Sequence, residues 1–484
     1  MDDGISQGTS HGHPAAREWL LIVAMTAVAW LPWLLLGGAL IGSAVVLGIW
    51  RLAVPPVAVG VFIGMVKDRR DGARLPGRVV RPGEEPELTE LVRDVAERLG
   101  FRSPLLVRVV PVPQAALGPA RVSGVRAFAL VLGLPLLRGL SAAQLAAVIA
   151  HELAHEQHVS DRRRARLAAS REALADRLDG RFRPLAPLAA PLLRASQRRA
   201  WEPELAADAD SARVAGTAAA RGALERTGPL DTAFEALGGR WLAGLDEQNA
   251  YPADFYEAFD AAFEDPYVAR RAARVAAESD ALDPYAAASH PPFARRVAAL
   301  PDFGGEGSYG DGPVPLRGAK EIERWCAAAL AGLDGADDLK PVRILATDPE
   351  RYFRPAGEDL AELLAVTRRD SRDGALAAAV DAVADGSWPR LARRLEPGLR
   401  WVPPVARPVA AREAVAGCVG RVLGDALRDA GWEHAGRWLG SVLAAPDGTT
   451  VVDVHDAVVT ALDTGDPGPV RELLQAAAGT GVAA

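Results

Sequence analysis

The sequence His151-Glu152-Leu153-Ala154-His155 follows the apolar run Leu145-Ala146-Ala147-Val148-Ile149-Ala150. Residues four apart share one face of an α-helix, so His151 and His155 can both point at one metal ion, with Glu152 beside it. A zinc peptidase holds its ion in this way and places a general base next to the water that it activates. The pentapeptide alone leaves a second interpretation open, which is an ordinary core helix whose histidines are hydrogen-bonded.

The sequence before this motif predicts where its helix begins. Ser141 and Gln144 have the spacing of a capping box, with Ser141 as N-cap and Gln144 in the first helical turn. Leu145, Ile149 and Leu153 are spaced four apart and predict one buried stripe. The two histidines lie on a neighbouring stripe, so one helix can face a core and a metal ion together.

A third metal ligand is expected, because a catalytic zinc usually has three protein ligands and a water. Glu204 and Asp208 lie four apart in a segment that also contains Glu202 and Asp210. Glu204 can ligate the ion, and Asp208 can accept a hydrogen bond from the free ring N–H of a ligating histidine, which fixes the tautomer. The alternative is a solvated acidic helix face. Pro203 is expected to start or kink this helix.

The segment Ser289-His290-Pro291-Pro292 predicts the start of a short helix, with His290 at its entrance. A histidine placed there can donate a hydrogen bond to the oxyanion of a tetrahedral intermediate. It can equally serve as a structural cap, and the sequence leaves both roles open.

In this order, the three elements resemble the HtpX-like family of membrane-associated zinc metallopeptidases, which also includes endopeptidases that trim prenylated CAAX proteins. The matching stretches are His-Glu-Leu-Ala-His at 151–155, Glu-Leu-Ala-Ala-Asp at 204–208 and Ser-His-Pro-Pro…Arg…Leu at 289–300. Residues 128–137 also look like the strand and turn that precede the family's zinc helix. The resemblance covers residues 88–300.

The resemblance implies an α+β, mostly helical fold, with a zincin-like metallopeptidase domain that contains a small sheet. It also implies one Zn²⁺ per chain, bound in gluzincin fashion by His151, His155 and Glu204, with Glu152 as general base. Asp208 would support a zinc ligand through a hydrogen bond, and His290 would assist catalysis.

The implied activity is zinc-dependent endopeptidase cleavage of peptides or proteins, among them misfolded membrane proteins. The alternative is a catalytically silent, membrane-tethered scaffold or sensor that keeps the peptidase fold.

The chain departs from the family pattern in two places. Gln114-Ala115 stands where family members often have an Asn-Ala pair. The interval between the two zinc motifs is Arg-rich, and its apolar part at 185–193 is broken by Pro187 and Pro191, so it cannot span a bilayer. The chain therefore resembles members of the family that have a single N-terminal membrane anchor.

Residues 19–66 are almost continuously apolar and are interrupted only by Arg51. This stretch is about twice the roughly 20 residues that one spanning helix needs, so we expect a transmembrane hairpin at 18–67 with spans at 18–40 and 43–66. A kinked single helix followed by a re-entrant Pro55-Pro56 segment is the alternative.

Basic residues between 67 and 78 follow the apolar stretch at once. The positive-inside rule places them, the catalytic domain and the tail at 1–17 in the cytoplasm. The lipid bilayer is therefore an expected partner, and the expected location is the cell membrane of a bacterium, with more than one span.

The rest of the chain divides into a metallopeptidase domain at 68–305, a Gly-rich linker at 306–315 and an Ala-rich helical domain of unknown role at 316–484. In the metallopeptidase domain we expect a helix at 88–99, strands at 105–112 and 128–132, and mixed structure at 217–288 that covers the cleft. The strand ahead of the zinc helix is the edge with which we expect an extended peptide to pair.

Composition excludes some classes of partner. The 484 residues carry a net charge of −7, and three of the 55 basic residues are lysines, a bias that indicates a GC-rich bacterial genome. The arginines are matched by Asp and Glu, so no nucleic-acid partner is expected. The two cysteines, Cys326 and Cys418, lie away from the ligand motifs and predict no disulfide framework.

Overall fold

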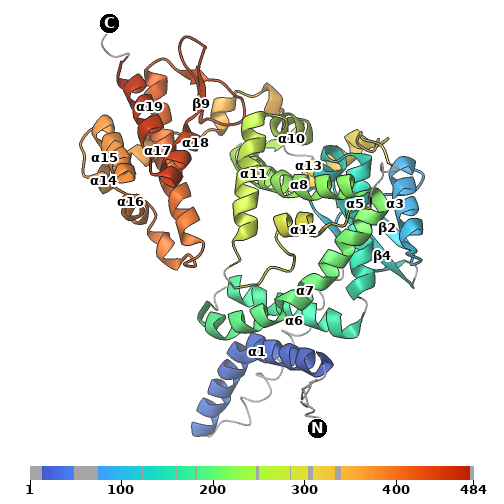
Figure 1. The fold of residues 1–484 in the computed structure, drawn as a ribbon. Helices are drawn as coiled ribbons and strands as arrows, with labels where there is room; N and C mark the ends of the chain where they lie inside the picture. The colour runs from blue at the N-terminus through green and yellow to red at the C-terminus, as the bar shows by residue number, and fades with distance from the viewer. Residues whose placement is uncertain are drawn as a thin grey trace, which may run out of the picture. The chain divides into compact units, whose positions relative to one another are not determined.

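The structure of the chain is a computed structural model that describes residues 14–47, 75–122, 124–159, 161–179, 183–246, 250–283, 285–303, 309–332 and 340–479. Contacts divide the chain into two compact units. The first is Met1–Thr227 with Tyr285–Ile322, and the second is Gly228–Pro284 with Glu323–Ala484. Helices predominate in both units, and the described residues contain three small sheets (Figure 1). The expected mostly helical fold with a small sheet is therefore present.

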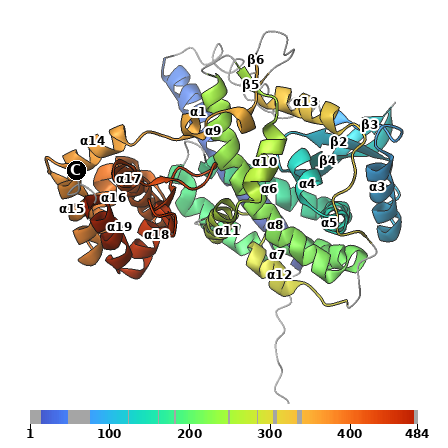
Figure 2. The same ribbon diagram turned by 90° about the horizontal axis from the view of Figure 1, so that it is seen from above.

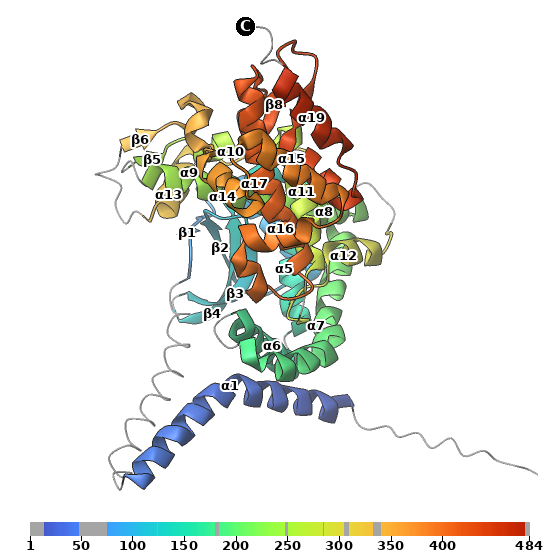
Figure 3. The same ribbon diagram turned by 90° about the vertical axis from the view of Figure 1, so that its left-hand side faces the viewer.

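The first half of helix α1 (Pro14–Val46) is docked on the first unit. It is buried in one apolar cluster with leucines of α6 (Arg162–Asp179) and α7 (Ala186–Ala215), and its own members of that cluster are Ile22, Met25 and Ala29. Figure 3 shows α1 running beneath α6 before it bends away. Pro32 inside the helix accounts for a bend, because proline removes one backbone hydrogen bond.

The predicted boundary between two membrane spans, between residues 40 and 43, is wrong. Helix α1 continues to Val46 through Gly38 and Gly42, because a glycine costs a helix interior only about 1 kcal/mol. Within the described residues, Ala16–Ala39 is the one helical segment that is long and apolar enough to cross a membrane, judged by length and composition. Residues 48–66 of the expected second span, the re-entrant alternative and the basic residues at 67–74 lie outside the described residues.

The first unit contains a mixed four-stranded sheet with the strand order β1-β2-β4-β3. Strand β2 (Leu105–Val110) is parallel to β4 (Val125–Gly133), while β1 (Arg78–Val79) and β3 (Ala115–Val122) are antiparallel neighbours. The strands predicted at 105–112 and 128–132 are thus confirmed as β2 and β4. The helix predicted at 88–99 is confirmed as α3 (Pro86–Leu99), which lies with α5 (Ala142–Val159) beside the sheet (Figure 2).

Strand β3 was not predicted, because Gly118 and Pro119 interrupt its sequence. Proline is tolerated there since β3 is an edge strand, where one row of backbone N–H groups has no neighbour to bond. The strand directly ahead of the metal-motif helix, β4, pairs on both sides. It therefore cannot serve as the peptide-binding edge that the sequence analysis expected.

Residues 228–284 fold with the second unit, whereas the sequence analysis included them in the metallopeptidase domain. The physical cause is a set of aromatic and ionic contacts within the second unit. Phe255 of α10 (Phe255–Phe263) packs edge-to-face on Trp241 of α9 (Gly239–Asp246). Arg271 of α11 (Pro266–Ala281) binds Asp453 with its Nη2 2.7 Å from Oδ1.

The second unit continues into a helical bundle with α17 (Arg407–Asp429) in its core. The other helices of the bundle are α14 (Gly357–Thr367), α15 (Arg372–Ala384), α16 (Trp388–Leu395), α18 (Val454–Thr464) and α19 (Gly468–Gly479). Helices expected in this region are therefore confirmed. A three-stranded sheet of β7 (Glu433–His434), β8 (Val442–Ala444) and β9 (Val451–Asp453) was not predicted, because its strands are too short to show a period.

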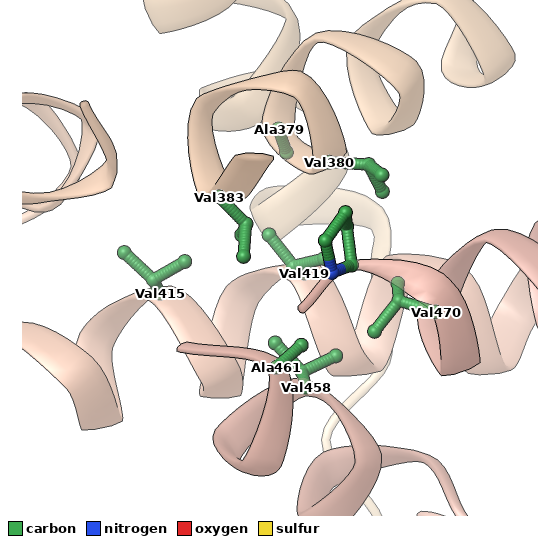
Figure 4. Close-up of a pocket in the computed structure, with 9 residues that line it drawn as sticks. Ala379, Val380, Val383, Val415, Val419, Val458, Ala461 and Val470 are labelled. Carbon is green, nitrogen blue, oxygen red and sulfur yellow. The ribbon is translucent and has the colours of Figure 1, made fainter. Parts of the chain in front are cut away.

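A small void in this bundle lies between α15, α17, α18 and α19 (Figure 4). Its volume is about 10 Å³ and its lining is mostly alanine and valine. A cavity of that size and polarity stays dry and has no room for a ligand. The bundle is therefore a packed core at this point.

Candidate metal centre

Helix α5 begins where the capping box predicted. The backbone N–H of Gln144 donates to Ser141 Oγ at 3.2 Å, and the backbone N–H of Ser141 donates to Gln144 Oε1 at 3.1 Å. The predicted stripe of Leu145, Ile149 and Leu153 is fully buried. Since that stripe faces the core, the neighbouring face of α5 carries the two histidines toward α7.

Helix α7 presents Glu204 and Asp208 to α5. The Ser211 hydroxyl, on α7, donates to the carbonyl oxygen of Ala147 at 2.8 Å and joins the two helices. Glu204 is 3% exposed and Asp208 is 4% exposed, so neither belongs to a solvated acidic face. Pro203 does not start the helix but lies inside it.

Three histidines approach the single carboxylate of Glu204. Its Oε1 lies 2.8 Å from His155 Nε2. Its Oε2 lies 3.4 Å from His151 Nε2 and 2.7 Å from His290 Nδ1. Side chains from α5, α7 and the segment before α12 (Phe293–Ala299) thus converge at one point.

Asp208 contacts the ring nitrogen of His151 that does not face Glu204. Its Oδ1 lies 2.9 Å from His151 Nδ1, which is the contact expected for a carboxylate that orients a ligating imidazole. Arg296 donates to both carboxylate oxygens of Asp208, through Nε at 2.9 Å and Nη2 at 2.7 Å. No role is predicted for Arg296 from the sequence, where its place in the 289–300 motif is the one feature that could have indicated it.

His290 enters the site from the exposed side. The helix that follows it begins at Phe293, as the proline pair predicted. The His290 side chain is 57% exposed, whereas that of Glu204 is 3% exposed. The convergence point is therefore closed by protein behind Glu204 and open to solvent beside His290.

The ionisable side chains of the site shift one another's pKa values. Burial raises the pKa of Glu204, but hydrogen bonds with His151, His155 and His290 outweigh burial and hold the pKa well below its ordinary value. Burial lowers the pKa of His151, but hydrogen bonds with Asp208 and Glu204 outweigh it and raise that pKa to about 9. Burial raises the pKa of Glu152, the residue beside His151 on α5.

The donor set fits a divalent metal ion. His151, Glu204 and His290 offer ligand atoms that all lie within 4.8 Å of one another, and His155 adds a nitrogen next to Glu204. Two ligand atoms on one tetrahedral zinc, at about 2.0–2.1 Å from it, lie about 3.3 Å apart. The 3.4 Å separation between Glu204 and His151 matches that value, whereas the 2.7 and 2.8 Å separations from His290 and His155 are those of hydrogen bonds. Imidazole nitrogen with carboxylate oxygen is a set that zinc favours.

His158, one turn beyond His155, does not join the site. Its Nε2 lies 2.9 Å from Asp210 Oδ2, so it pairs elsewhere on α7. His158 is therefore a neighbouring histidine that is hydrogen-bonded to Asp210.

Comparison with known proteins gives one weak similarity. A protease HtpX homolog of Pelotomaculum thermopropionicum is 32% identical over 140 residues, which is 29% of this chain and 46% of that relative. The chain therefore spans less than half the length of the relative it matches. No family model matches the chain, and no solved structure matches it. These findings support an HtpX-like family and nothing finer.

Proposed function

We propose that this protein is a zinc-dependent endopeptidase that α1 holds at a membrane. The observation that carries the proposal is the contact of one buried carboxylate, Glu204, with the imidazoles of His151, His155 and His290. The similarity to a protease HtpX homolog supports the same reaction class. The ligand atoms of His151, Glu204 and His290 lie close enough together to hold a metal ion.

In the proposed site, His151, His155 and Glu204 hold the zinc ion. When bound, zinc would act as a Lewis acid and lower the pKa of water toward neutrality. Glu152 takes a proton from the attacking water and later passes it to the leaving amine. Exposed His290 donates a hydrogen bond to the oxyanion that develops on the substrate carbonyl.

Asp208 and Arg296 position this machinery. Asp208 accepts the Nδ1 proton of His151 and so leaves Nε2 free to act as ligand. Arg296 neutralises Asp208 and fixes its orientation through two hydrogen bonds. Because Arg296 and His290 lie on the same short segment, the ion pair between Arg296 and Asp208 also connects that segment to α7.

The substrate strand is proposed to pair with β3. It is an edge strand of the sheet and packs against α5, which carries His151 and Glu152. An extended peptide can add to such an edge through backbone hydrogen bonds, with little dependence on sequence. Peptides and unfolded proteins, including misfolded membrane proteins, are the proposed substrates.

Membrane attachment is proposed through the apolar segment Ala16–Ala39. The exposed second half of α1 carries Leu34 and Leu35, which lipid would cover. A second span at 48–66 and a cytoplasmic catalytic unit remain part of the proposal, because basic residues follow that stretch.

The reaction is tested by Glu152→Gln in the purified full-length protein, with casein as substrate. The variant is expected to keep its zinc and lose casein cleavage, since an amide cannot accept the proton from water. Glu202→Gln, an exposed position on α7, is the matched control and is expected to cleave normally. Unchanged cleavage by Glu152→Gln contradicts the mechanism. Stoichiometric zinc with no cleavage by the unaltered protein favours the silent scaffold instead.

A further inference from the structure

The second unit contains a cavity of about 690 Å³ that the proposed peptidase chemistry does not use. We call it the arginine pocket and define it by Arg240, Arg271, Tyr352, Arg421, His434 and His455. Its volume falls in the range of small-molecule sites, about 300–1,000 Å³. All of its lining residues belong to the second unit, so it is independent of the metal centre.

The lining of the arginine pocket is rich in cations. Six arginines line it, against the two carboxylates of Glu350 and Asp425. Some of the arginines pair with carboxylates that do not line the pocket. Arg421 binds Asp359 through two hydrogen bonds, and Arg271 binds Asp453. Positive charge nevertheless remains at the cavity wall.

Arg240 has no carboxylate partner among the described residues. Its Nη1 donates to the carbonyl oxygen of Trp438 at 3.4 Å. Burial and the nearby charge of Arg271 lower the pKa of Arg240. A half-buried guanidinium beside another guanidinium is unfavourable unless an anion joins them.

Two buried polar atoms of the pocket also lack partners. In the described part of the chain, no hydrogen bond is made by Tyr352 Oη or His434 Nδ1. Tyr352 is 9% exposed, so water does not readily replace the missing bond. Native proteins rarely leave such groups unsatisfied, and a ligand is one of the ordinary reasons.

One wall of the pocket suits a planar group. There the rings of Phe353 and His434 lie 4.9 Å apart between centroids. A flat ring can stack on such a surface.

We propose that the arginine pocket binds a small phosphate ester that carries a planar ring, a nucleotide being the simplest example. Guanidinium groups, a tyrosine hydroxyl and imidazole nitrogens are donors that suit the several oxygens of a phosphate. The phosphate joins Arg240 to Arg271, and Tyr352 donates its hydroxyl proton to the same group. The ring of the ligand lies against Phe353 and His434.

The test is calorimetric titration of the full-length protein with adenosine monophosphate, inorganic phosphate, adenosine and citrate. Adenosine monophosphate is expected to bind best, because it offers both the phosphate and the ring. Tyr352→Phe should weaken that binding about tenfold, the effect of one hydrogen bond to a charged group. The same variant should leave thermal stability unchanged, since the Tyr352 hydroxyl has no partner among the residues that the structure describes.

Arg240→Gln is the second variant. It should abolish detectable binding and should not lower the melting temperature, because it removes a cation repelled by Arg271. Arg390→Gln, an exposed arginine of α16 outside the pocket, is the matched control and should bind normally.

Three results overturn the proposal. One is that neither phosphate nor the nucleotide binds at millimolar concentration. Another is that binding persists unchanged in Tyr352→Phe and Arg240→Gln. The third is that citrate binds where the phosphates do not, which assigns the pocket to carboxylates. All three measurements are independent of proteolysis, so failure of the peptidase proposal would not alter them.

Discussion

Glu204 Oε1 lies 2.8 Å from His155 Nε2, although the two residues belong to different helices. Sequence spacing could place His151 and His155 on one face of α5, but only packing of α7 on α5 could bring a carboxylate to them. Ser211 and the buried stripe of α5 supply that packing. The relationship makes a shared metal ion the simplest use of the three side chains.

Two histidines contact opposite oxygens of Glu204, His155 at Oε1 and His290 at Oε2, and each is a candidate ligand. We expect His155→Ala to lose zinc, because the proposed ligand set contains both histidines of α5, each of which contacts Glu204. We expect His290→Ala to keep zinc and to lower kcat for casein about 100-fold, the effect of removing one oxyanion donor. Metal analysis by mass spectrometry, beside steady-state kinetics, separates the two roles. Loss of zinc from His290→Ala, with zinc kept by His155→Ala, would assign the ligand set to His151, Glu204 and His290 instead.

Asp208→Asn should weaken zinc binding about 10- to 100-fold, because His151 loses the carboxylate that orients it. It should also lower the free energy of unfolding by about 3 kcal/mol, since Arg296 keeps its buried charge without a counter-charge. Competition with a zinc chelator and urea denaturation measure the two effects.

Asp210→Asn is the control for that variant. It lies on the same helix but pairs with His158 and Arg213 at a partly exposed position. Such a pair contributes at most about 1 kcal/mol, and zinc affinity should not change. Equal effects of the two variants would contradict the positioning role of Asp208.

Arg171 is a buried cation that holds the segment leading to His290. It is 3% exposed and donates to the carbonyl oxygens of Leu193 at 2.6 Å and Ala286 at 2.8 Å. Arg171→Met should cost at least about 2 kcal/mol of unfolding free energy, because buried carbonyl groups lose their donor. Casein cleavage should fall while zinc content stays, since His290 loses its anchor but the ligands do not. Arg162→Met, an exposed change on the same helix, should alter neither quantity.

His455 should give the second unit a pH-dependent stability. Burial and Arg271 lower its pKa, but hydrogen bonds with Asp456 and Glu413 outweigh them, so the pKa stands above 6.5. A histidine whose pKa is raised by folding stabilises the folded protein. This contribution is complete below about pH 6.5 and is lost as the pH rises through the pKa of the folded state.

Glu413 contributes to how the stability of the second unit changes at low pH. Burial raises its pKa, but His455 and Arg412 hold it at about 2, so its contribution is lost only as pH falls below about 4.5. Urea denaturation between pH 5 and 9 should therefore show a decline above neutrality, and His455→Gln should flatten it. An identical decline in His455→Gln would remove His455 from this role.

Local features were the ones that could be predicted. The Ser141–Gln144 box, the stripe through Leu153 and the two histidines all follow from helix spacing, and the structure has them on α5. Glu204 was a candidate ligand from its spacing to Asp208 and from the need for a third ligand. Its approach to the histidines was not fixed by the sequence, because nothing between 155 and 204 determines how α7 packs on α5.

Features set by tertiary contacts were missed. Arg296 looks like one surface arginine among many until its burial against Asp208 is known. Strand β3 contains Pro119, which sequence rules exclude from a central strand but not from an edge. The grouping of α10 and α11 with the second unit depends on pairs such as Arg271 with Asp453, far apart in sequence.

The zinc content of the purified full-length protein, beside that of Glu204→Gln, tests the central claim most directly. The account predicts one zinc ion per chain in the unaltered protein and its loss from Glu204→Gln, with circular dichroism unchanged. An unaltered protein that takes up no zinc, or a Glu204→Gln protein that keeps its full complement, would contradict it.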